Sequence, residues 1–275
     1  MTLQSKQDKL TKIVQELKSV AVAFSSGVDS TFLLKTAHDV LGDRTLAVTV
    51  RACLFPNREF DEAVQFAKTA DIEHITVDVD AFGIAGFSQN PADRCYLCKT
   101  ALFLQIRRAA EERGISHVIE GSNADDSGDY RPGLQAIAEL GILSPLRESG
   151  LTKQEIRQLS REQGLPTWNK QSLACLASRI PYGEEITKER LAMIDMAEQY
   201  LLDAGFNQVR VRFHGNLARI ETDEAGWQRL LNQSLREDIH RRFKELGFAY
   251  IAMDLLGYRA GSMNETLGNF ILTEK

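Results

Sequence analysis

The sequence lacks a long apolar run and has no excess of positive charge. No stretch approaches the length that crosses a bilayer, which excludes a membrane-spanning protein. A formal net charge of −5 disfavours a large nucleic-acid footprint, because proteins that bind polyanions are usually basic. The first twenty residues carry charges throughout and have no apolar signal core. We therefore expect a cytoplasmic protein with neither a membrane nor a nucleic acid as partner.

Cysteine is also scarce, with 4 in 275 residues. In a cytosolic chain, so few thiols suit metal binding or catalysis better than structural disulfides. Cys53 stands between Ala52 and Leu54, and we expect it in the hydrophobic core. The composition is otherwise that of a globular protein, with 43% hydrophobic residues, and the length suits one large domain or two modest ones.

Apolar strands alternate with amphipathic helices through the first part of the chain. This alternation predicts an α/β fold with a parallel, doubly wound sheet that carries helices on both faces. The last helix of this part opens with a capping box, Thr152 to Glu155. Strands are expected at 20–24, 45–50, 74–79 and 117–120, and helices at 10–17, 30–40, 59–69 (with Asn57 as N-cap), 99–113 and 152–163.

The pattern changes after Pro181, and we expect two domains, 1–170 and 171–275. The second is expected to be a smaller α+β domain, because a helix, a hairpin, a helix and a strand follow in that order. Their expected bounds are 187–204 for the first helix, 209–213 and 218–221 for the hairpin, 237–246 for the second helix and 250–255 for the last strand.

An apolar strand runs directly into Ser25-Ser26-Gly27-Val28-Asp29-Ser30, where a helix starts. Backbone N–H groups, serine hydroxyls and a helix N-terminus around one point form a phosphate site. The alternative is an ordinary strand-to-helix turn with a serine cap. The loop is not a Walker A loop, because no Gly-Lys-Ser/Thr follows, and a single glycine excludes the dinucleotide fingerprint.

This loop resembles the SGGxDS loop of the PP-loop ATP pyrophosphatases, which fold like adenine nucleotide alpha hydrolases. The resemblance implies that Ser25, Gly27, Asp29 and Ser30 hold the pyrophosphate part of ATP. Ser26 belongs to the same loop and replaces its second glycine, a place where we expect a serine to fit only with a negative φ.

A second loop, EGSNADDSGDYRPG, follows the strand expected at 117–120. In an open parallel sheet both loops fall at the carboxyl ends of the strands, where ligands bind. Carboxylates beside a triphosphate suggest Mg²⁺ coordination or hydrogen bonds to ribose. The alternative is a solvated acidic loop whose aspartates form turns.

Cys95 and Cys98 directly precede the helix expected from Lys99, and a helix N-terminus favours the thiolate. With the distant Cys175 they are too few for a structural zinc site, which has four protein ligands. Three thiols on a [4Fe-4S] cluster would leave one iron open. The alternatives are a redox dithiol, half of a zinc site closed by His or Asp, and buried small hydrophobes.

The run VRVRFH alternates, so Arg210, Arg212 and His214 share one face of a strand, where Arg219 is expected to join them. A cationic face on an acidic protein suits an anionic ligand such as a nucleotide phosphate, and Arg259 could extend it. The alternative is an exposed edge whose charges block aggregation.

Long motifs carry a more specific resemblance. The chain is similar to the LarE family, ATP-dependent sulfur transferases that build the nickel-pincer nucleotide cofactor of lactate racemase. That family has a PP-loop domain and a smaller C-terminal domain. The motifs are AVAFSSGVDST, EGSNADDSGDYRPG, SPLRESGLTKQEIR, LPTWNKQSLACLASRIPYG, VRVRFHGNLARIE and GYRAGSMNE.

The resemblance implies a reaction and its site. ATP adenylates a carboxylate of pyridinium-3,5-biscarboxylic acid mononucleotide, pyrophosphate leaves, and a sulfur nucleophile displaces AMP to give a thiocarboxylate. Mg²⁺ offsets phosphate charge. The implied ligands are Lys99 for the ATP phosphates, Asp126, Asp129 and Arg131 for the nucleotide, and Arg210, Arg212 and Arg259 for the substrate phosphate.

The source of the sulfur divides the family. In one branch the cysteine near the position of Cys175 gives up its own sulfur and becomes dehydroalanine. In the other, three cysteines hold a [4Fe-4S] cluster that carries an extra sulfide. The chain resembles the second branch, which implies a sulfide donor and, as in the family, a homo-oligomer. The residues taken as catalytic are Cys95, Cys98, Cys175 and Asp29, the three cysteines also as metal ligands.

Three rivals stay open. A PP-loop tRNA thiolase also uses three cysteines, but its polyanionic substrate fits the acidic balance poorly. A non-thiolating amidotransferase or synthetase has no use for three thiols. A nucleotide-binding iron–sulfur or zinc sensor would bind ATP without releasing pyrophosphate.

Overall fold

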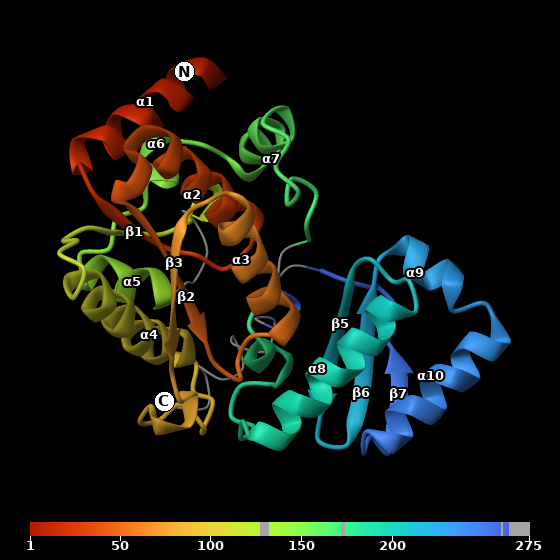
Figure 1. Ribbon diagram of the computed structural model, residues 1–275. Helices are drawn as coiled ribbons and strands as arrows, with labels where there is room; N and C mark the ends of the chain where they lie inside the picture. Colours follow the sequence, from red (N-terminus) through yellow and green to blue (C-terminus); the bar gives the residue numbers. More distant parts are fainter. Residues whose placement is uncertain (127–131, 172–173, 260, 264–275) are drawn as a thin grey trace. The chain divides into compact units, whose positions relative to one another are not determined.

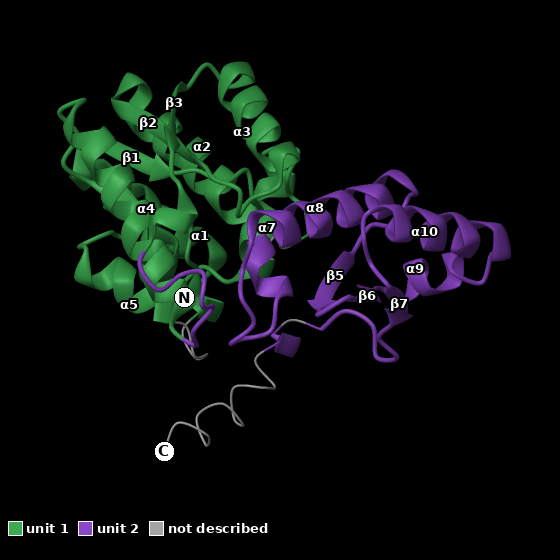
Figure 2. Ribbon diagram, turned by 90° about the horizontal axis from the view of Figure 1, so that it is seen from below, with its two compact units in different colours: residues 1–84, 93–173 green, residues 85–92, 174–275 purple. Residues whose placement is uncertain are grey.

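The computed structural model describes residues 1–126, 132–171, 174–259 and 261–263 (Figure 1). The chain forms two compact units (Figure 2). The first comprises residues 1–84 and 93–173, and the second comprises 85–92 and 174–275. The chain therefore passes between the units at three points, after residues 84, 92 and 173.

The first unit is built on a parallel sheet of four strands in the order β3-β2-β1-β4. The strands run outward from β1 to β3, and the chain then returns to place β4 on the other side of β1. The crevice between β1 and β4 is thus the switch point where open α/β sheets bind ligands. The bounds are β1 Val20–Ala23, β2 Thr45–Arg51, β3 Glu73–Asp78 and β4 Val118–Ile119.

Helices cover both faces of this sheet, which confirms the predicted doubly wound α/β fold (Figure 1). Successive β1 side chains enter different cores, with Val20 and Val22 on one face and Ala21 on the other. The first core takes side chains from α1 Leu3–Leu17, α2 Val28–Leu41, α3 Asn57–Thr69, α6 Pro145–Ser149 and α7 Lys153–Glu162; the second takes them from α4 Arg94–Glu111 and α5 Pro132–Glu139.

The second unit contains a three-stranded sheet, β5-β6-β7. The predicted hairpin of β5 and β6 is antiparallel and turns at Gly215, whose φ of 62° suits a glycine. Strand β7 joins β6 in parallel, and the buried rings of Phe243 and Phe248 pack against each other at a tilt, with their centroids 5.7 Å apart. The bounds are α8 Lys188–Asp203, β5 Val209–His214, β6 Leu217–Thr222, α9 Glu224–Arg229, α10 Gln233–Glu245 and β7 Tyr250–Met253.

Some helices begin at residues other than those predicted, because neighbouring residues carry competing signals for a helix start. Helix α3 begins at Asn57 with Pro56 at its N-cap, so the predicted cap was one residue late. Helix α4 begins at Arg94, which places Cys95 and Cys98 inside its first turns instead of before it. The short helices α5, α6 and α9 were not predicted, because five to eight residues carry little periodicity. The capping box of α7 is present as predicted.

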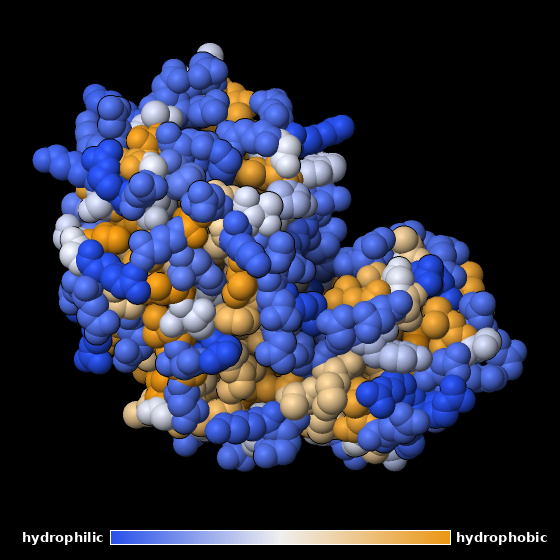
Figure 3. Space-filling view, viewed as in Figure 1, coloured by the Kyte–Doolittle hydropathy of each residue, from blue (hydrophilic) through white to orange (hydrophobic). Residues whose placement is uncertain are grey.

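Within the described ranges, no helix combines the length and apolar character needed to cross a bilayer. Figure 3 shows polar and charged side chains over much of the face in view, with smaller apolar patches between them. In the second unit Tyr250, Leu255 and Leu256 are exposed.

Gly226 supports a stability prediction. A Cβ at this residue of α9 would lie 2.9 Å from Cδ1 of Phe206 and would overlap the Thr222 hydroxyl. We expect Gly226→Ala to lower the free energy of unfolding by about 1–3 kcal/mol in urea titrations, because the packed core must shift. At Gly83 the nearest atom is an Asp80 oxygen at 4.0 Å, so Gly83→Ala serves as the control. Equal midpoints for the two variants would contradict the packing described.

Candidate functional site

The loops that follow β1 and β4 meet at the switch point of the first unit. Asn123 Nδ2 donates to Asp29 Oδ1 at 3.4 Å. Gly121 lies so close to the start of α2 that a Cβ there would be 3.1 Å from Ser30 N and 3.3 Å from Asp29 Cβ. The two loops predicted to share one edge of the sheet are therefore in contact.

The loop from β1 leaves the N-terminus of α2 without a side-chain cap. Gly27 occupies the N-cap and offers no side chain to the first amides of the helix. Ser25 and Ser30 point their hydroxyls at each other, 3.1 Å apart, and Ser25 N donates to Ser30 Oγ at 3.3 Å. The serine-capped turn considered as the alternative is thus not what forms, and this helix start suits an anion.

Ser26 adopts a left-handed backbone with a φ of 54°, so the expectation of a negative φ was wrong. A non-glycine residue in this region costs about 1–2 kcal/mol. The cost is offset by local hydrogen bonds, because the buried Ser26 hydroxyl donates to the Glu59 carbonyl at 3.0 Å. The Lys170 ammonium also donates to Ser26 O at 3.0 Å and to Ser26 Oγ at 3.1 Å.

Two lysines at this loop escaped the sequence analysis. Lys153, the first residue of α7, pairs with Asp29 Oδ2. Lys170 contacts Ser26 and also pairs with Glu62. Both are remote in sequence from the loop, so only the fold brings their charges to it. The one signal in the sequence was the position of Lys153 inside the capping box of α7.

Lys99 projects from the second turn of α4 and rests on α5. A Cβ on Gly133 would lie 2.7 Å from Lys99 Cδ and 3.5 Å from the Cys95 carbonyl, so the lysine stem packs on the bare glycine. In the part of the chain that the structure describes, the Lys99 ammonium has no hydrogen bond or ion pair. Its positive charge is available to an anionic ligand.

The acidic loop after β4 uses its carboxylates in local structure. Asp126 Oδ2 accepts from Asn123 N at 2.9 Å, and Asp125 Oδ2 accepts from Lys153 N at 2.8 Å. Such bonds are expected of the alternative in which the aspartates form turns. They shape the loop that brings Asn123 to Asp29. Asp129 and Arg131 lie outside the described residues.

The cysteines are divided between the units. Cys95 and Cys98 stand three residues apart on α4 of the first unit, and Cys175 precedes a 3-10 helix, Leu176–Arg179, in the second. Among the residues described, no three His, Cys, Asp or Glu side chains are grouped as a metal site requires. The grouping of all three thiols stays a prediction. Cys53 is exposed, so its assignment to the core was wrong; the turn after β2 buries Leu54 instead.

The backbone of Cys175 is held by a buried ion pair. Arg179 Nη1 donates to the Cys175 carbonyl at 3.0 Å and also to the carbonyl of Ala174. The same guanidinium makes two 2.8 Å bonds to Glu198, and both side chains are at most 1% exposed. Burial would raise the pKa of Glu198, but the charge and hydrogen bonds of Arg179 outweigh it and hold that pKa below its ordinary value.

Four charged side chains face one another on the β5–β6 ribbon. In its register Arg210 opposes Glu221 and Arg212 opposes Arg219, so the predicted alternation holds and Arg219 joins the face. Glu221 is buried and accepts from Arg212 at 2.7 Å and from Arg219 at 3.1 Å. Arg210 and Arg212 are 4% and 5% exposed, which contradicts the alternative of an exposed protective edge.

Among the described residues, this arginine cluster holds more arginines than carboxylates. Burial, followed by the nearby Arg179, lowers the pKa of Arg210 to about 10, so the group remains charged at neutral pH. Arg212 Nε, Arg219 Nε and His214 Nε2 are buried without a hydrogen-bond partner among the described residues. Among the described residues of the cluster, five arginines (179, 210, 212, 219, 259) stand beside three carboxylates (198, 221, 254), a setting that suits an anion.

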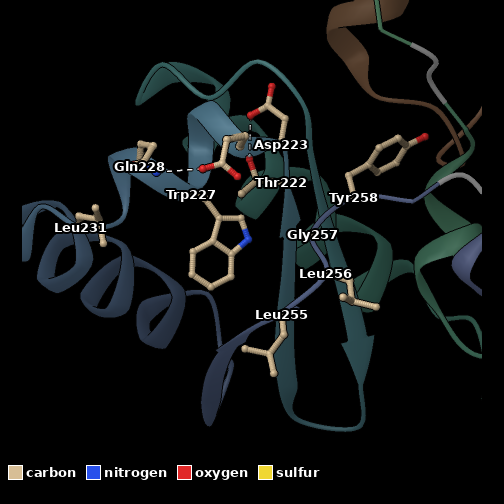
Figure 4. A pocket seen from close by; sticks show the side chains of 10 residues that line it. Thr222, Asp223, Trp227, Gln228, Leu231, Leu255, Leu256, Gly257 and Tyr258 are labelled. Atoms are coloured by element: carbon tan, nitrogen blue, oxygen red, sulfur yellow. Dashed lines mark hydrogen bonds between the residues drawn. The ribbon is translucent and has the colours of Figure 1, made fainter.

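A cavity of about 410 Å³ adjoins this cluster (Figure 4). The two share Tyr258, whose ring lies 5.2 Å from the Arg210 guanidinium. Trp227 stands in the middle of the cavity and Leu255 at one side (Figure 4). The acidic Asp223 and Glu224 in its wall disfavour a phosphate there, so the arginine face is the better anion site.

Comparison with known proteins places the chain among relatives of matching length. It is 42% identical over 266 residues to an uncharacterized protein of Synechocystis, covering 96% of this chain and 99% of that protein. It is 38% identical over 267 residues to the pyridinium-3,5-bisthiocarboxylic acid mononucleotide synthase of Lactiplantibacillus plantarum, covering 97% and 96%. A more distant relative is the argininosuccinate synthase of Natronomonas pharaonis, 31% identical over 160 residues, 54% of this chain and 39% of that protein. No family model matches the chain.

Ser26 permits a test of the loop. Glycine adopts a φ of 54° without strain, whereas alanine retains the strain and loses the hydroxyl bonds. We expect Ser26→Ala to lower the free energy of unfolding by about 1 kcal/mol and Ser26→Gly to lower it by less, as measured in urea. A less stable glycine variant would show that Ser26 does not need the left-handed conformation.

Proposed function

The chain belongs to the LarE family, and we propose that it is an ATP-dependent sulfur transferase that converts a carboxylate of pyridinium-3,5-biscarboxylic acid mononucleotide into a thiocarboxylate. The observation that carries the proposal is the 38% identity with the synthase of Lactiplantibacillus plantarum, which extends over 97% of the chain. We assign ATP activation to residues 1–170, and substrate binding and sulfur transfer mainly to residues 171–275.

In the activation step, a substrate carboxylate oxygen attacks the α-phosphorus of ATP. The bond to the bridging oxygen breaks, pyrophosphate leaves with the electron pair, and an acyl adenylate remains. The uncapped start of α2, with Ser25 and Ser30, suits the leaving pyrophosphate. Lys99, Lys153 and Lys170 supply positive charge to it.

Asp29 would be the loop's ligand for Mg²⁺, because it is the carboxylate of the phosphate loop itself. Its oxygens are engaged by Lys153 and Asn123. A divalent ion bound with ATP would take over one of these oxygens and leave Lys153 free to turn toward phosphate. Mg²⁺ would supply charge neutralisation to the phosphates.

In the transfer step, a sulfur nucleophile attacks the acyl carbon, the bond from that carbon to the AMP oxygen breaks, and AMP departs. By residue type, Cys95, Cys98 and Cys175 are the thiols that would hold a [4Fe-4S] cluster, which three ligands would leave with one open iron. Such a cluster would supply a transferable sulfide. Arg179 and Glu198 keep the Cys175 backbone in place for this role.

The alternative source of sulfur is Cys175 itself. Its thiolate would attack the acyl carbon and displace AMP to form a thioester. Loss of the Cα proton with cleavage of the Cβ–S bond would then release the thiocarboxylate and leave dehydroalanine. That route needs neither Cys95 nor Cys98, so the pair favours the cluster.

The substrate phosphate is assigned to Arg210 and Arg212 of the arginine cluster, with Arg259 beside them. The burial of Arg210 and Arg212, and Arg212 Nε, which has no partner among the described residues, support this assignment. Arg259 pairs with Asp254 at 3.1 Å, which positions its guanidinium at the end of the cluster.

The test uses protein purified without oxygen. With ATP and the pyridinium substrate we expect pyrophosphate, AMP and a thiocarboxylate product, about four irons per chain and an unchanged mass for Cys175. An iron-free protein whose Cys175 loses hydrogen sulfide would establish the sacrificial route. Tight, salt-sensitive tRNA binding, or no pyrophosphate with the substrate, would overturn the proposed function.

Lys153 provides a prediction for the activation step. Lys153→Ala removes a cation that neighbours the loop carboxylate, and we expect the KM for ATP in pyrophosphate release to rise about 10-fold, the value of one charge-assisted hydrogen bond. Lys6→Ala is the control, because Lys6 pairs with Glu155 on the same helix and not with the loop. Equal KM values for both variants would remove Lys153 from the site.

Arg210 links stability to substrate binding. Its pKa in the folded protein, about 10, lies below its ordinary value, so folding opposes protonation and destabilises the protein at every pH below about 10. At pH 7 we therefore expect Arg210→Met to raise the free energy of unfolding by about 1–4 kcal/mol and to abolish binding of the substrate mononucleotide.

The control for this variant is Arg241→Met, which changes an arginine on α10 whose side chain is 69% exposed. We expect the free energy of unfolding of this variant, and its binding of the substrate mononucleotide, to stay near those of the unmodified protein. Retained mononucleotide binding by Arg210→Met, or a loss of stability at pH 7, would contradict the role given to the buried charge.

A further inference from the structure

Three side-chain nitrogens without a partner lie on one face of the β5–β6 ribbon. Arg212 Nε, His214 Nε2 and Arg219 Nε are buried, and none makes a hydrogen bond among the residues that the structure describes. Arg212 and His214 are two residues apart on β5, so their side chains leave the strand on the same side. Arg219 on β6 is paired with Arg212 and is the diagonal neighbour of His214. The three nitrogens therefore belong to one patch, which lies within the second unit.

The two guanidinium groups of this patch are fixed by other bonds. Arg212 Nη2 donates to Glu221 at 2.7 Å and to Ser262 Oγ at 3.1 Å. Arg219 Nη2 donates to Glu221 at 3.1 Å, and Arg219 Nη1 lies 3.4 Å from Asp254 Oδ2. These bonds use the Nη atoms and leave each Nε–H unused. Because buried donors are normally bonded, the Nε edges suit an acceptor that a ligand brings.

His214 differs from its neighbours because its charge can change near neutral pH. Burial lowers the pKa of His214 below its ordinary value, and the charge of Arg219 lowers it further. The imidazole of the protein by itself is therefore mainly neutral at pH 7. The charged groups that face it come from β5, from β6 and from the segment before α8, and they are Arg212, Arg219, Glu221 and Glu184. The two carboxylates act in the opposite direction but do not cancel the effect of burial.

A bound phosphate would reverse the balance at His214. Its negative charge favours the imidazolium, and an imidazolium donates from Nε2. A phosphate ester has three terminal oxygens that are strong acceptors, whereas a carboxylate has two. Three oxygens can meet three donors, one from each of Arg212, His214 and Arg219. By the number of its donors, the patch matches a phosphate better than a carboxylate.

We propose that His214 is a ligand of the substrate phosphate, together with Arg212 and Arg219, and that it holds the phosphate as the imidazolium. The proposal rests on the proposed function and deepens it, because it takes the phosphate of the mononucleotide as the anion of this face. Each phosphate dianion that binds draws up to one proton from the solvent onto the imidazole, and no other bond forms or breaks. Since the two equilibria are linked, protonation of His214 strengthens phosphate binding by the same factor.

Calorimetry of the full-length protein tests this proposal, with pyridinium-3,5-biscarboxylic acid mononucleotide titrated at pH 7 in two buffers of different ionisation enthalpy. A phosphate ester, with a second pKa of about 6, is already mostly a dianion at this pH, so a proton taken up goes to the protein. We expect uptake of at least about half a proton per bound molecule, since an opposite charge close by raises such a pKa by about 1–3 pH units. The dissociation constant should rise about 3- to 10-fold between pH 7 and pH 8.5.

His214→Gln removes the titrating group and keeps a polar side chain. We expect this variant to bind the mononucleotide about 10-fold more weakly at pH 7, because it lacks one hydrogen bond from a charged donor, and to take up no proton. Its dissociation constant should not change between pH 7 and pH 8.5. His240→Gln is the matched control, because His240 is exposed on α10, and it should behave like the unmodified protein.

The pyridinium nucleoside that lacks the phosphate distinguishes the two kinds of anion in the substrate. It should cause no proton uptake; uptake with the nucleoside would assign the patch to a carboxylate and overturn the proposal. Mononucleotide binding without proton uptake, or with uptake that persists in His214→Gln, would overturn it as well, while the proposed function stands. A mononucleotide that does not bind the unmodified protein at all would overturn both.

If His214→Gln does not fold, NMR of the unmodified protein decides. The chain has 5 histidines, and the ring signal of His214 is assigned through its sequence neighbours Phe213 and Gly215. With the mononucleotide bound, this signal should titrate at a pH at least about 1 unit higher than without it. An unchanged titration of His214 would remove it from the phosphate site.

Discussion

The contacts of the Asp29 carboxylate hold together the edge of the first unit where the loops after β1 and β4 meet. This carboxylate receives Lys153 from α7 and Asn123 from the loop after β4, so three segments distant in sequence converge on one side chain. Without that negative charge, the α2 N-terminus and the neighbouring lysines would repel one another. Under the proposed function, a nucleotide with its metal would bring equivalent charges to the same arrangement.

The arginine cluster of the second unit shows the opposite balance of charge, with positive groups in excess among the described residues. Among the described residues of the arginine cluster, the arginines outnumber the carboxylates, and burial makes their charge costly, as the lowered pKa of Arg210 shows. Glu221 and Glu198 relieve part of that cost and leave donors such as Arg212 Nε without a partner among the described residues. Under the proposed function, such a face would give up stability in the empty state in exchange for binding an anion.

Much of this could be predicted from the sequence. The four parallel strands, the capping box of α7 and the shared edge of two loops follow from periodicity and from the geometry of parallel sheets. The φ of Ser26 and the exposure of Cys53 could not, because tertiary contacts of the backbone decide them. Lys153 and Lys170 reach the loop across more than 120 residues, a distance at which residue spacing carries no signal.

The excursion of residues 85–92 also sets an order of events during biosynthesis. Asn90 leaves the ribosome 90 residues before its partner Ile180, so at about 5–20 residues per second it waits roughly 5–20 s for that partner. Through this interval the apolar ring of Phe87 has no finished core to enter. The nascent first unit must therefore carry the apolar segment 85–92 without its packing partners until the second unit has been made. Because that segment belongs to the second unit, dividing the gene at one point cannot separate the two units.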